Sequence, residues 1–420
     1  MRRLLIVFMA VCLQRKLKLD FHVKHWKAIM KSVFAHDHIF INDGECFYSR
    51  SGFPQSVLQR YANAFGAVDV ICRSSYQRIV NDIEPIQDER VSFFPQKNIR
   101  EVKGVRYFFY VNKKMSRLIE DSDVVVARLP STLGLMAARL ARKHNKVCLV
   151  EVVGNAFEAS KMHGSKMGFF SAPIEHYLMA KTVLNASTVV YITSEYLQSV
   201  YPTTGDSYVC PNVKISAARM HDIKNRLELA KSKKRKTIGL VGSLNVDYKG
   251  HEVALRVLKK IHQQGFDNVK IELVGPGDPS RWKEIAEGLG ISLNVVFKGY
   301  ISPGDRMYEW LDTIDVLLQP SLTEGQGRAI IEAMSRGCPV VASNVGGIPE
   351  LLSPECVFDA NDVDGFSNAC LRLLNDLELC SSVCERNFSE SRRFLPEVIE
   401  EARRTVFDDV IRKVEGNKFE

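Results

Sequence analysis

The 420-residue sequence lacks several features that would place it in well-defined classes. It has no low-complexity tract and no repeat of solenoid period, and its apolar segment near the start, about ten residues, is too short to cross a bilayer. Its basic runs carry no interleaved aromatic residues, and no zinc finger, RNA-recognition or helix-turn-helix signature is present, so a nucleic-acid partner is not expected. No Walker sequence occurs.

Cysteine usage also excludes a disulfide or metal framework. The ten cysteines form no CxxC pair. Cys380 and Cys384 lie one helical turn apart in a leucine-rich segment, and we predict that they are buried as small apolar side chains. Reduced thiols and a cytoplasmic location follow as expectations.

The formal net charge of +8 is concentrated in part at the start of the sequence. Residues 1–35 combine an apolar stretch with many basic residues, and Trp26, Ile29, Met30 and Val33 recur at helical spacing. This pattern predicts a basic amphipathic helix on an anionic membrane surface, giving peripheral contact with the inner face of the membrane. A buried helix and a misassigned start codon are the alternatives.

From residue 36 onward, apolar strand patterns alternate with helical patterns, which favours parallel βαβ units. The alternation pauses near Pro211 and then restarts. We therefore predict an α/β fold with two doubly wound Rossmann-like domains, residues 36–210 and 211–390, and a C-terminal helix in 391–420 that packs back on the first domain. Such domains bind ligands at the carboxyl ends of their strands.

The segment "TEGQGRAIIEAMSRG" contains the strongest candidate site. Glu324 precedes Gly325 and Gly327, so we place it in a loop, with a helix beginning near Arg328 and Glu332 facing outward from its second turn. The free amides of a helix start bind anions, and carboxylates can accept hydrogen bonds from sugar hydroxyls. A cation at this position opposes the helix dipole unless an anion is bound. A surface loop with two solvated acids is the alternative.

Two further loops face the same edge of the predicted sheet. Lys249, beside a glycine and just before a helix, could reach the same phosphates, and Gly242 follows the preceding strand. Gly275, in "VGPGD", could border a nucleobase. A lysine beside a glycine is more often simply solvated, so these features alone are weak.

The second half resembles the donor-binding domain of glycosyltransferase family 4, the large group 1 family with the GT-B fold. The match covers most of residues 208–352 and is strongest in "LLQPSLTEGQGRAIIEAMSRGCPVVASNVGGIPEL", which carries the E-x7-E pattern of the family as Glu324 and Glu332. The resemblance implies a nucleotide-sugar donor. Glu324 would bind hydroxyls of the transferred sugar, Glu332 the ribose, and Lys249 the diphosphate. Members typically retain the anomeric configuration and need no metal.

The resemblance has one departure and a weaker first half. A second basic residue is usual six positions before the lysine, where this chain has Ser243, and we expect Arg328 to supply the missing charge. The glycine-rich loop of the first domain corresponds to "GECFYSRSGFP", with Gly44 and Gly52 as candidates for the donor diphosphate. The polar residue near the reacting carbon is sought among four candidates, each of which could equally be structural: Arg128, Asn155, Glu158 and His163.

The sequence therefore predicts a retaining glycosyltransferase that moves a hexose or N-acetylhexosamine from a UDP- or GDP-sugar to a glycan or lipid-linked acceptor, in surface polysaccharide biosynthesis. Its catalytic candidates are Glu324, Lys249, Arg328 and His163, without metal or other cofactor. A non-catalytic nucleotide-sugar-binding scaffold subunit and another GT-B enzyme, such as a nucleotide-sugar epimerase, are the alternatives. A metal-dependent GT-A enzyme is disfavoured, because neither "DSD" nor "DVD" follows an apolar strand.

Overall fold

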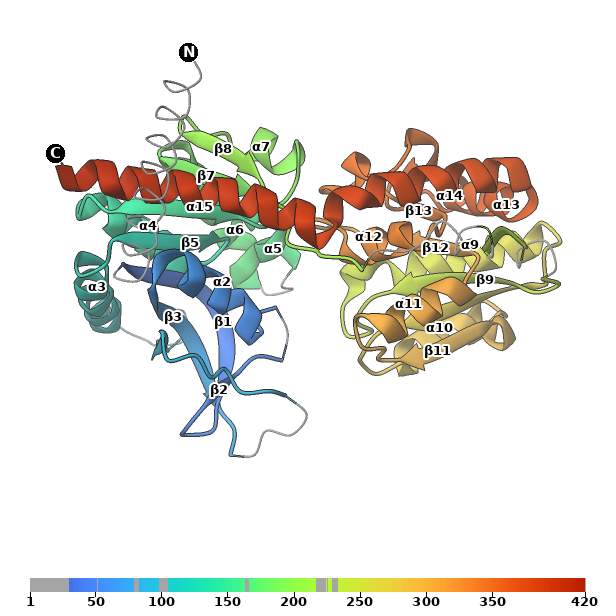
Figure 1. Cartoon of the computed structure of the whole chain (residues 1–420). Coiled ribbons are helices and arrows are strands. Elements are labelled where there is room, and N and C mark those ends of the chain that lie inside the picture. The colour runs from blue at the N-terminus through green and yellow to red at the C-terminus, as the bar shows by residue number, and fades with distance from the viewer. Residues whose placement is uncertain are drawn as a thin grey trace, which may run out of the picture.

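The computed structural model of the chain describes residues 30–50, 52–78, 83–97, 105–162, 166–216, 224, 226–228 and 233–419. Two lobes lie side by side, and each is built around one sheet with helices on its faces (Figure 1). No helix in these described ranges is long and apolar enough to cross a membrane.

The first lobe contains an eight-stranded sheet in the order β4-β3-β1-β5-β6-β7-β8, with β2 paired antiparallel to β1 and every other pairing parallel. Its strands are β1 Lys31–Asn42, β2 Phe47–Tyr48, β3 Ala67–Tyr76, β4 Val91–Pro95, β5 Val124–Leu129, β6 Val147–Val152, β7 Thr188–Tyr191 and β8 Asp206–Val209. Its helices are α2 Gln55–Phe65, α3 Val105–Glu120, α4 Thr132–Lys143, α5 Ala156–Met162, α6 Lys166–Leu184 and α7 Tyr196–Val200.

The second lobe contains a six-stranded parallel sheet in the order β11-β10-β9-β12-β13-β14. Its strands are β9 Lys236–Val241, β10 Val269–Val274, β11 Val295–Gly299, β12 Val316–Gln319, β13 Val340–Ser343 and β14 Val357–Phe358. Its helices are α9 His251–Gln263, α10 Ser280–Gly288, α11 Asp305–Thr313, α12 Arg328–Ser335, α13 Val363–Asn375 and α14 Leu377–Ser391, with short 3₁₀ turns at Asp247–Lys249 (η1) and Ile348–Glu350 (η3). Both doubly wound halves are as predicted.

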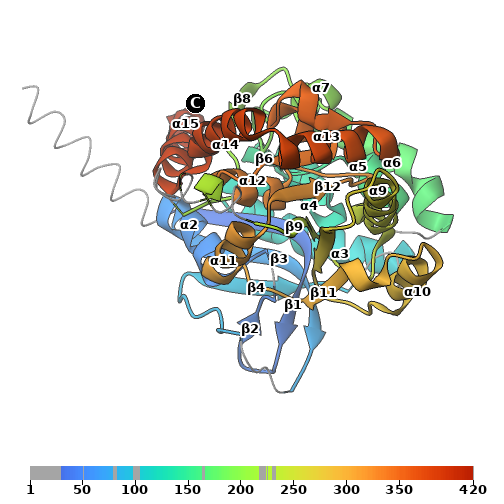
Figure 2. The ribbon, with the colours of Figure 1, turned by 90° about the vertical axis from the view of Figure 1, so that its right-hand side faces the viewer.

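The last helix, α15 (Pro396–Phe419), returns from the second lobe and runs along the first (Figure 1). The Phe407 ring packs at 4.9 Å from that of Phe65 on α2, and Lys413 Nζ lies 2.5 Å from a carboxylate oxygen of Asp206 on β8. The predicted return of this helix to the first domain is confirmed. Figure 2, turned by 90°, shows α15 beside α2 and α14.

The structure corrects the sequence prediction at the start of the first lobe. Residues 31–35 belong to β1 and not to an amphipathic helix; Val33 is completely buried and Met30 almost so. Ser32, Phe34 and Ala35 are buried too, as expected of a central strand covered on both faces. The predicted helix residues before Met30 lie outside the described part of the chain.

Candidate active site at the end of β12

The candidate site begins where β12 ends and α12 starts. Gly327 has a φ of +75° and precedes the first residue of α12, Arg328, with no side-chain cap. A left-handed conformation at this position favours glycine, which explains why the chain has one there. The predicted helix start is therefore correct, and its first amides have no intrahelical partner and no side-chain cap.

Lys249 and Glu324 meet across this edge of the sheet. Lys249 Nζ lies 2.5 Å from Glu324 Oε1, and the Ser321 hydroxyl donates to the same oxygen at 3.1 Å. Both ionic side chains are partly exposed, at 22% for Lys249 and 13% for Glu324. The two residues that the sequence assigned to one site are thus in direct contact, at a position open to a ligand.

Close backbone approaches hold the loops of this site together. A Cβ on Gly275 would lie 1.9 Å from the carbonyl oxygen of Gly242, and a Cβ on Gly242 would lie 2.7 Å from Lys249 Cβ. On the other side of Lys249, Gly250 has a φ of +77°, and a Cβ there would lie 2.0 Å from the carbonyl oxygen of Pro320. These glycines therefore let the η1 turn and Lys249 lie directly against the ends of β9, β10 and β12.

The glycine pair before η3 supports the Glu324 loop. A Cβ on Gly346 would lie 1.8 Å from the Glu324 carbonyl oxygen, and the Gly347 amide donates to the Gly325 carbonyl at 3.1 Å. The contacts of this pair identify it as the support that fixes the backbone of Glu324.

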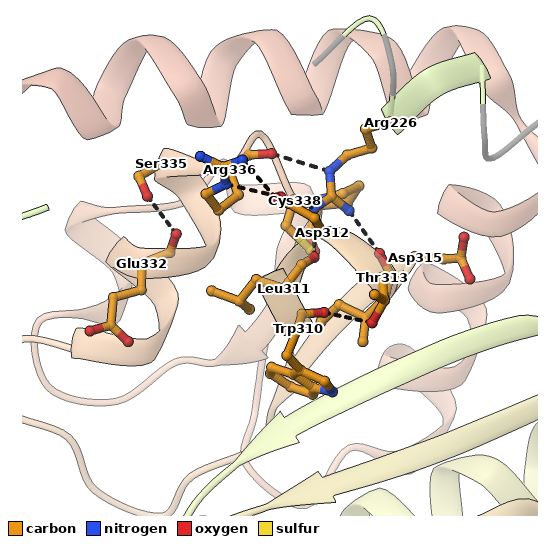
Figure 3. A network of polar contacts seen from close by, with 12 residues as sticks. Arg226, Trp310, Leu311, Asp312, Thr313, Asp315, Glu332, Ser335, Arg336 and Cys338 are labelled. Carbon is orange, nitrogen blue, oxygen red and sulfur yellow. Dashed lines mark hydrogen bonds and ion pairs between the residues drawn. The ribbon is translucent and has the colours of Figure 1, made fainter. Parts of the chain in front are cut away.

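Glu332 is more buried than predicted, with 7% of the residue exposed. Figure 3 shows its carboxylate pointing away from the polar network at the end of α12. Burial raises the pKa of this carboxyl, and nearby Arg328 partly opposes that effect. Within the described part of the chain, no hydrogen bond to the carboxylate oxygens was found. The carboxylate oxygens are not themselves fully buried, so hydrogen-bond donors of a bound ligand can reach them.

The network in Figure 3 anchors the C-terminal end of α12. Arg226 donates to the carbonyl oxygens of Leu311 at 2.6 Å, Ile314 at 2.7 Å and Arg336 at 3.1 Å. Arg336 in turn forms two hydrogen bonds with the Asp312 carboxylate, at 2.9 and 2.6 Å. α12 is consequently fixed at the end opposite to the site.

Arg328 is exposed, and none of the described residues forms an ion pair with its guanidinium. A cation in the first turn of a helix is unfavourable with respect to the helix dipole. The charge is thus available to an anion bound beside the helix start. Ser243, at the position of the missing second cation, instead accepts from the Asn245 amide and donates to the Pro276 carbonyl.

Residues of the first lobe reach this site through Glu158 on α5. Its carboxylate accepts a hydrogen bond from Thr323 Oγ1 at 2.5 Å and one from Tyr196 OH at 2.7 Å. Asn155 also donates to Tyr196 OH, at 2.9 Å. Glu158 therefore connects the two lobes at the residue before Glu324, and the sequence contained no signal for the part played by Tyr196.

Two more contacts join the lobes near the same loop. Glu350 accepts from the amides of Ser194 and Tyr196 at 2.6 and 2.5 Å. Gln326 donates to the Ile192 carbonyl at 2.5 Å. Gly325 also lies at the boundary, because a Cβ there would be 3.3 Å from the Val153 carbonyl oxygen.

The other candidates of the first lobe do not meet the Lys249–Glu324 pair. Gly44 lies in the turn between β1 and β2, a hairpin that projects away from α12 (Figure 1). Gly52 precedes Phe53, over whose ring Arg128 lies at 5.3 Å, and Arg128 is bound by Glu151 at 2.7 Å, which gives it a structural role. His163 lies outside the described residues. Donor contacts of Gly44 and Gly52 stay predictions.

Comparison with known proteins places this arrangement in a known family. Residues 235–376 match the family described as "Glycosyl transferases group 1". The chain is 34% identical over 374 residues to Protein CapJ of Staphylococcus aureus, covering 87% of this chain and 90% of that protein. It is 27% identical over 289 residues to the GDP-mannose-dependent alpha-(1-6)-phosphatidylinositol monomannoside mannosyltransferase of Mycobacterium tuberculosis, covering 63% of this chain and 71% of that enzyme.

The fold has a solved counterpart in HepE of Anabaena in complex with UDP and glucose. The TM-score is 0.61 at 16% identity, covering 92% of this chain and 99% of that one. This likeness confirms the GT-B arrangement of the two lobes.

Proposed function

The chain belongs to the group 1 glycosyltransferases, and from this premise we propose that it transfers a hexose or N-acetylhexosamine from a UDP- or GDP-sugar to a glycan or lipid-linked acceptor, with retention of anomeric configuration. The observation that carries the proposal is the Lys249–Glu324 contact beside the uncapped start of α12. It brings a cation, a carboxylate and free helix amides to one edge of the sheet, which suits a sugar diphosphate. The choice of GDP and UDP is supported by the GDP-mannose dependence named for the mannosyltransferase and by the UDP named in the HepE complex.

In this proposal, binding of the donor replaces the ion pair between Lys249 and Glu324. The diphosphate approaches the α12 amides and takes Lys249 as its counter-ion, with Arg328 as the second cation. Glu324, released from Lys249, then accepts hydrogen bonds from hydroxyls of the transferred sugar. Glu332 accepts the ribose hydroxyls, which supplies the donors that its buried carboxylate lacks among the described residues.

The chemical step follows from this placement. As the bond between the sugar and the diphosphate breaks, negative charge grows on the leaving group, and fixed cations and amides stabilise that charge. The acceptor hydroxyl loses its proton to the departing phosphate and attacks from the same face. The protein mainly has to hold the two substrates in position and neutralise the leaving group. Metal independence and a role in surface polysaccharide synthesis are further parts of the proposal.

Sugar transfer by the Glu324→Ala variant tests the assignment of the donor sugar. We expect transfer to fall by at least about 100-fold, the loss typical of a group that acts on the transition state. The anomeric configuration of the wild-type product, read by NMR, tests retention. Transfer by the variant within a few-fold of wild type would remove Glu324 from the donor sugar, and an inverted product would exclude the retaining step.

The second-cation role is tested by donor affinity of Arg328→Ala. Arg306→Ala is the matched control, because Arg306 is also exposed in the first turn of a neighbouring helix, α11. We expect the donor Kd to rise about tenfold for the Arg328 variant and to stay within twofold for the control. Equal affinities in both variants would show that Arg328 does not compensate for Ser243.

A further inference from the structure

A large groove lies on the first lobe, between α4 and α6, away from the Lys249–Glu324 pair. Its volume is about 820 Å³, which is within the range of sites for sizeable ligands. Apolar side chains make up much of its lining: Phe108, Leu135, Met136, Val147, Val150 and Leu178. An apolar interior of this size can bury hydrocarbon.

All charged side chains in the lining of the groove are positive. The groove residues include Arg139, Arg142, Lys146, Lys181 and Lys413, and the described lining contains no aspartate or glutamate. Lys413 is bonded to Asp206, whereas the other four form no ion pair with any residue that the structure describes. Such a lining complements an anionic ligand.

Apolar side chains continue from the groove onto the surface of α6. Leu178 lines the groove and is 45% exposed. Ile174, one turn earlier on the helix, and the adjacent Tyr177 are also exposed. Exposed apolar residues grouped at helical spacing beside a cavity indicate an interaction site more than chance exposure does.

The groove is adjacent to a second cavity at the edge of the sheet where the strands end. This cavity, of about 350 Å³, shares the lining residues Thr132 and Leu135 with the groove. It lies where β5 and β6 end, and its lining is more polar, with Arg73, Ser160 and Glu175. Ser160 is on α5, the helix whose Glu158 contacts Thr323 beside Glu324. A ligand could therefore extend from the apolar groove to the reaction site.

We propose that the groove binds the hydrocarbon chain and the phosphate of an anionic lipid-linked acceptor, whose saccharide occupies the polar cavity. The inference rests on the proposed function, and it selects the lipid-linked class from the two acceptor classes named there. The apolar lining takes the chain, the unpaired cations take the phosphate, and the shared residues lead the saccharide toward α5. A nucleic acid would also satisfy the cations, but it would leave the apolar lining and the exposed face of α6 uncovered.

Calorimetric titration of the full chain with dodecyl phosphate, below its micelle concentration, tests the groove. Inorganic phosphate and dodecyl maltoside serve as the anionic and apolar comparisons. We expect dodecyl phosphate to bind at least tenfold more tightly than either. Equal binding of inorganic phosphate, or of dodecyl maltoside, would overturn the proposal, as would tighter binding of a single-stranded oligonucleotide.

Two pairs of variants locate the binding. Leu178→Glu and Arg142→Glu should each weaken dodecyl phosphate at least fivefold. The controls, Leu293→Glu and Lys143→Glu, should change the affinity for dodecyl phosphate less than twofold. Leu293 is 91% exposed on the other lobe, and Lys143 is exposed beside Arg142 but is not part of the groove lining. Equal effects of variant and control within a pair would overturn the location.

The same preparations, titrated with nucleotide sugars, separate this inference from the proposed function. Donor affinity should be unchanged in Leu178→Glu and Arg142→Glu, since the groove lining contains none of the candidate donor residues. Donor binding without dodecyl phosphate binding would overturn the groove alone. Dodecyl phosphate binding without any donor binding would overturn the proposed function, and with it the acceptor role of the groove.

Discussion

Replacement of Lys249 by methionine should separate the catalytic value of this side chain from its structural value. Lys249 and Glu324 are in contact at 2.5 Å, but both are partly exposed, and such pairs add about 1 kcal/mol or less to stability. If Lys249 neutralises the leaving diphosphate, its removal should cost about 10²–10³ in kcat, or roughly 3–4 kcal/mol of transition-state stabilisation. We therefore expect Lys249→Met to melt within a few degrees of wild type and to be nearly inactive.

The ion pair of Lys270 and Glu272 provides the matched control. It lies on β10 of the same lobe, at 2.6 Å, with exposures of 25% and 8% that resemble those of the site pair. Lys270→Met should cost similar stability and leave activity unchanged. The assay is release of nucleoside diphosphate from the sugar donor, followed in parallel with thermal unfolding. A loss of less than about threefold in kcat for Lys249→Met, or an equal loss in both variants, would refute the reasoning.

Three further predictions concern the supports of the site. In urea unfolding, Gly250→Ala should lower the free energy of unfolding by at least about 2 kcal/mol more than Gly265→Ala, because both glycines have positive φ but only Gly250 lies against a carbonyl oxygen. Equal losses in the two variants would contradict the close packing. Burial raises the pKa of Glu332, so the wild-type protein loses stability as the pH rises through that pKa, and Glu332→Gln should melt at a higher temperature than wild type at pH 8 and at the same temperature at pH 4. A difference in melting temperature that does not depend on pH would exclude the raised pKa. Arg226→Ala should lose about 2–4 kcal/mol, because its three carbonyl acceptors become unpaired, and a loss below about 1 kcal/mol would contradict the anchor in Figure 3.

Local sequence chemistry was sufficient to predict the loop and helix start that carry Glu324 and Arg328. The glutamate before two glycines indicated a loop, and the end of that loop indicated that the helix begins near Arg328. In the structure, α12 begins at Arg328. The rule that strand ends of a parallel sheet gather their loops placed Lys249 and Glu324 at one edge. Their direct contact was not predicted and comes from the structure. These features are set by residues near one another in the chain or by the topology of the sheet.

What the sequence could not show depends on contacts between distant segments. Helical spacing of Met30 and Val33 suggested an amphipathic helix, yet Ser32, Phe34 and Ala35 are buried as well, because β1 lies inside the sheet between β3 and β5 and is covered on both faces. The burial of Glu332 and the support of Glu324 by Gly346 arise only when α12 and the η3 turn pack together. The bridge from Glu158 to Thr323 joins residues 165 positions apart, and no local pattern predicts such a partner.

The most direct test of the account is a melting experiment on the purified chain with UDP, GDP and a panel of their sugars, with and without EDTA. A ligand at 100 times its Kd adds about 2.7 kcal/mol to the stability of the domain that binds it, which is readily detected. We predict a shift with one nucleotide family, unaffected by EDTA and abolished in Lys249→Met at the same concentration. The absence of a shift with every nucleotide sugar, or an undiminished shift in the variant, would contradict a donor site built on Lys249 and Glu324.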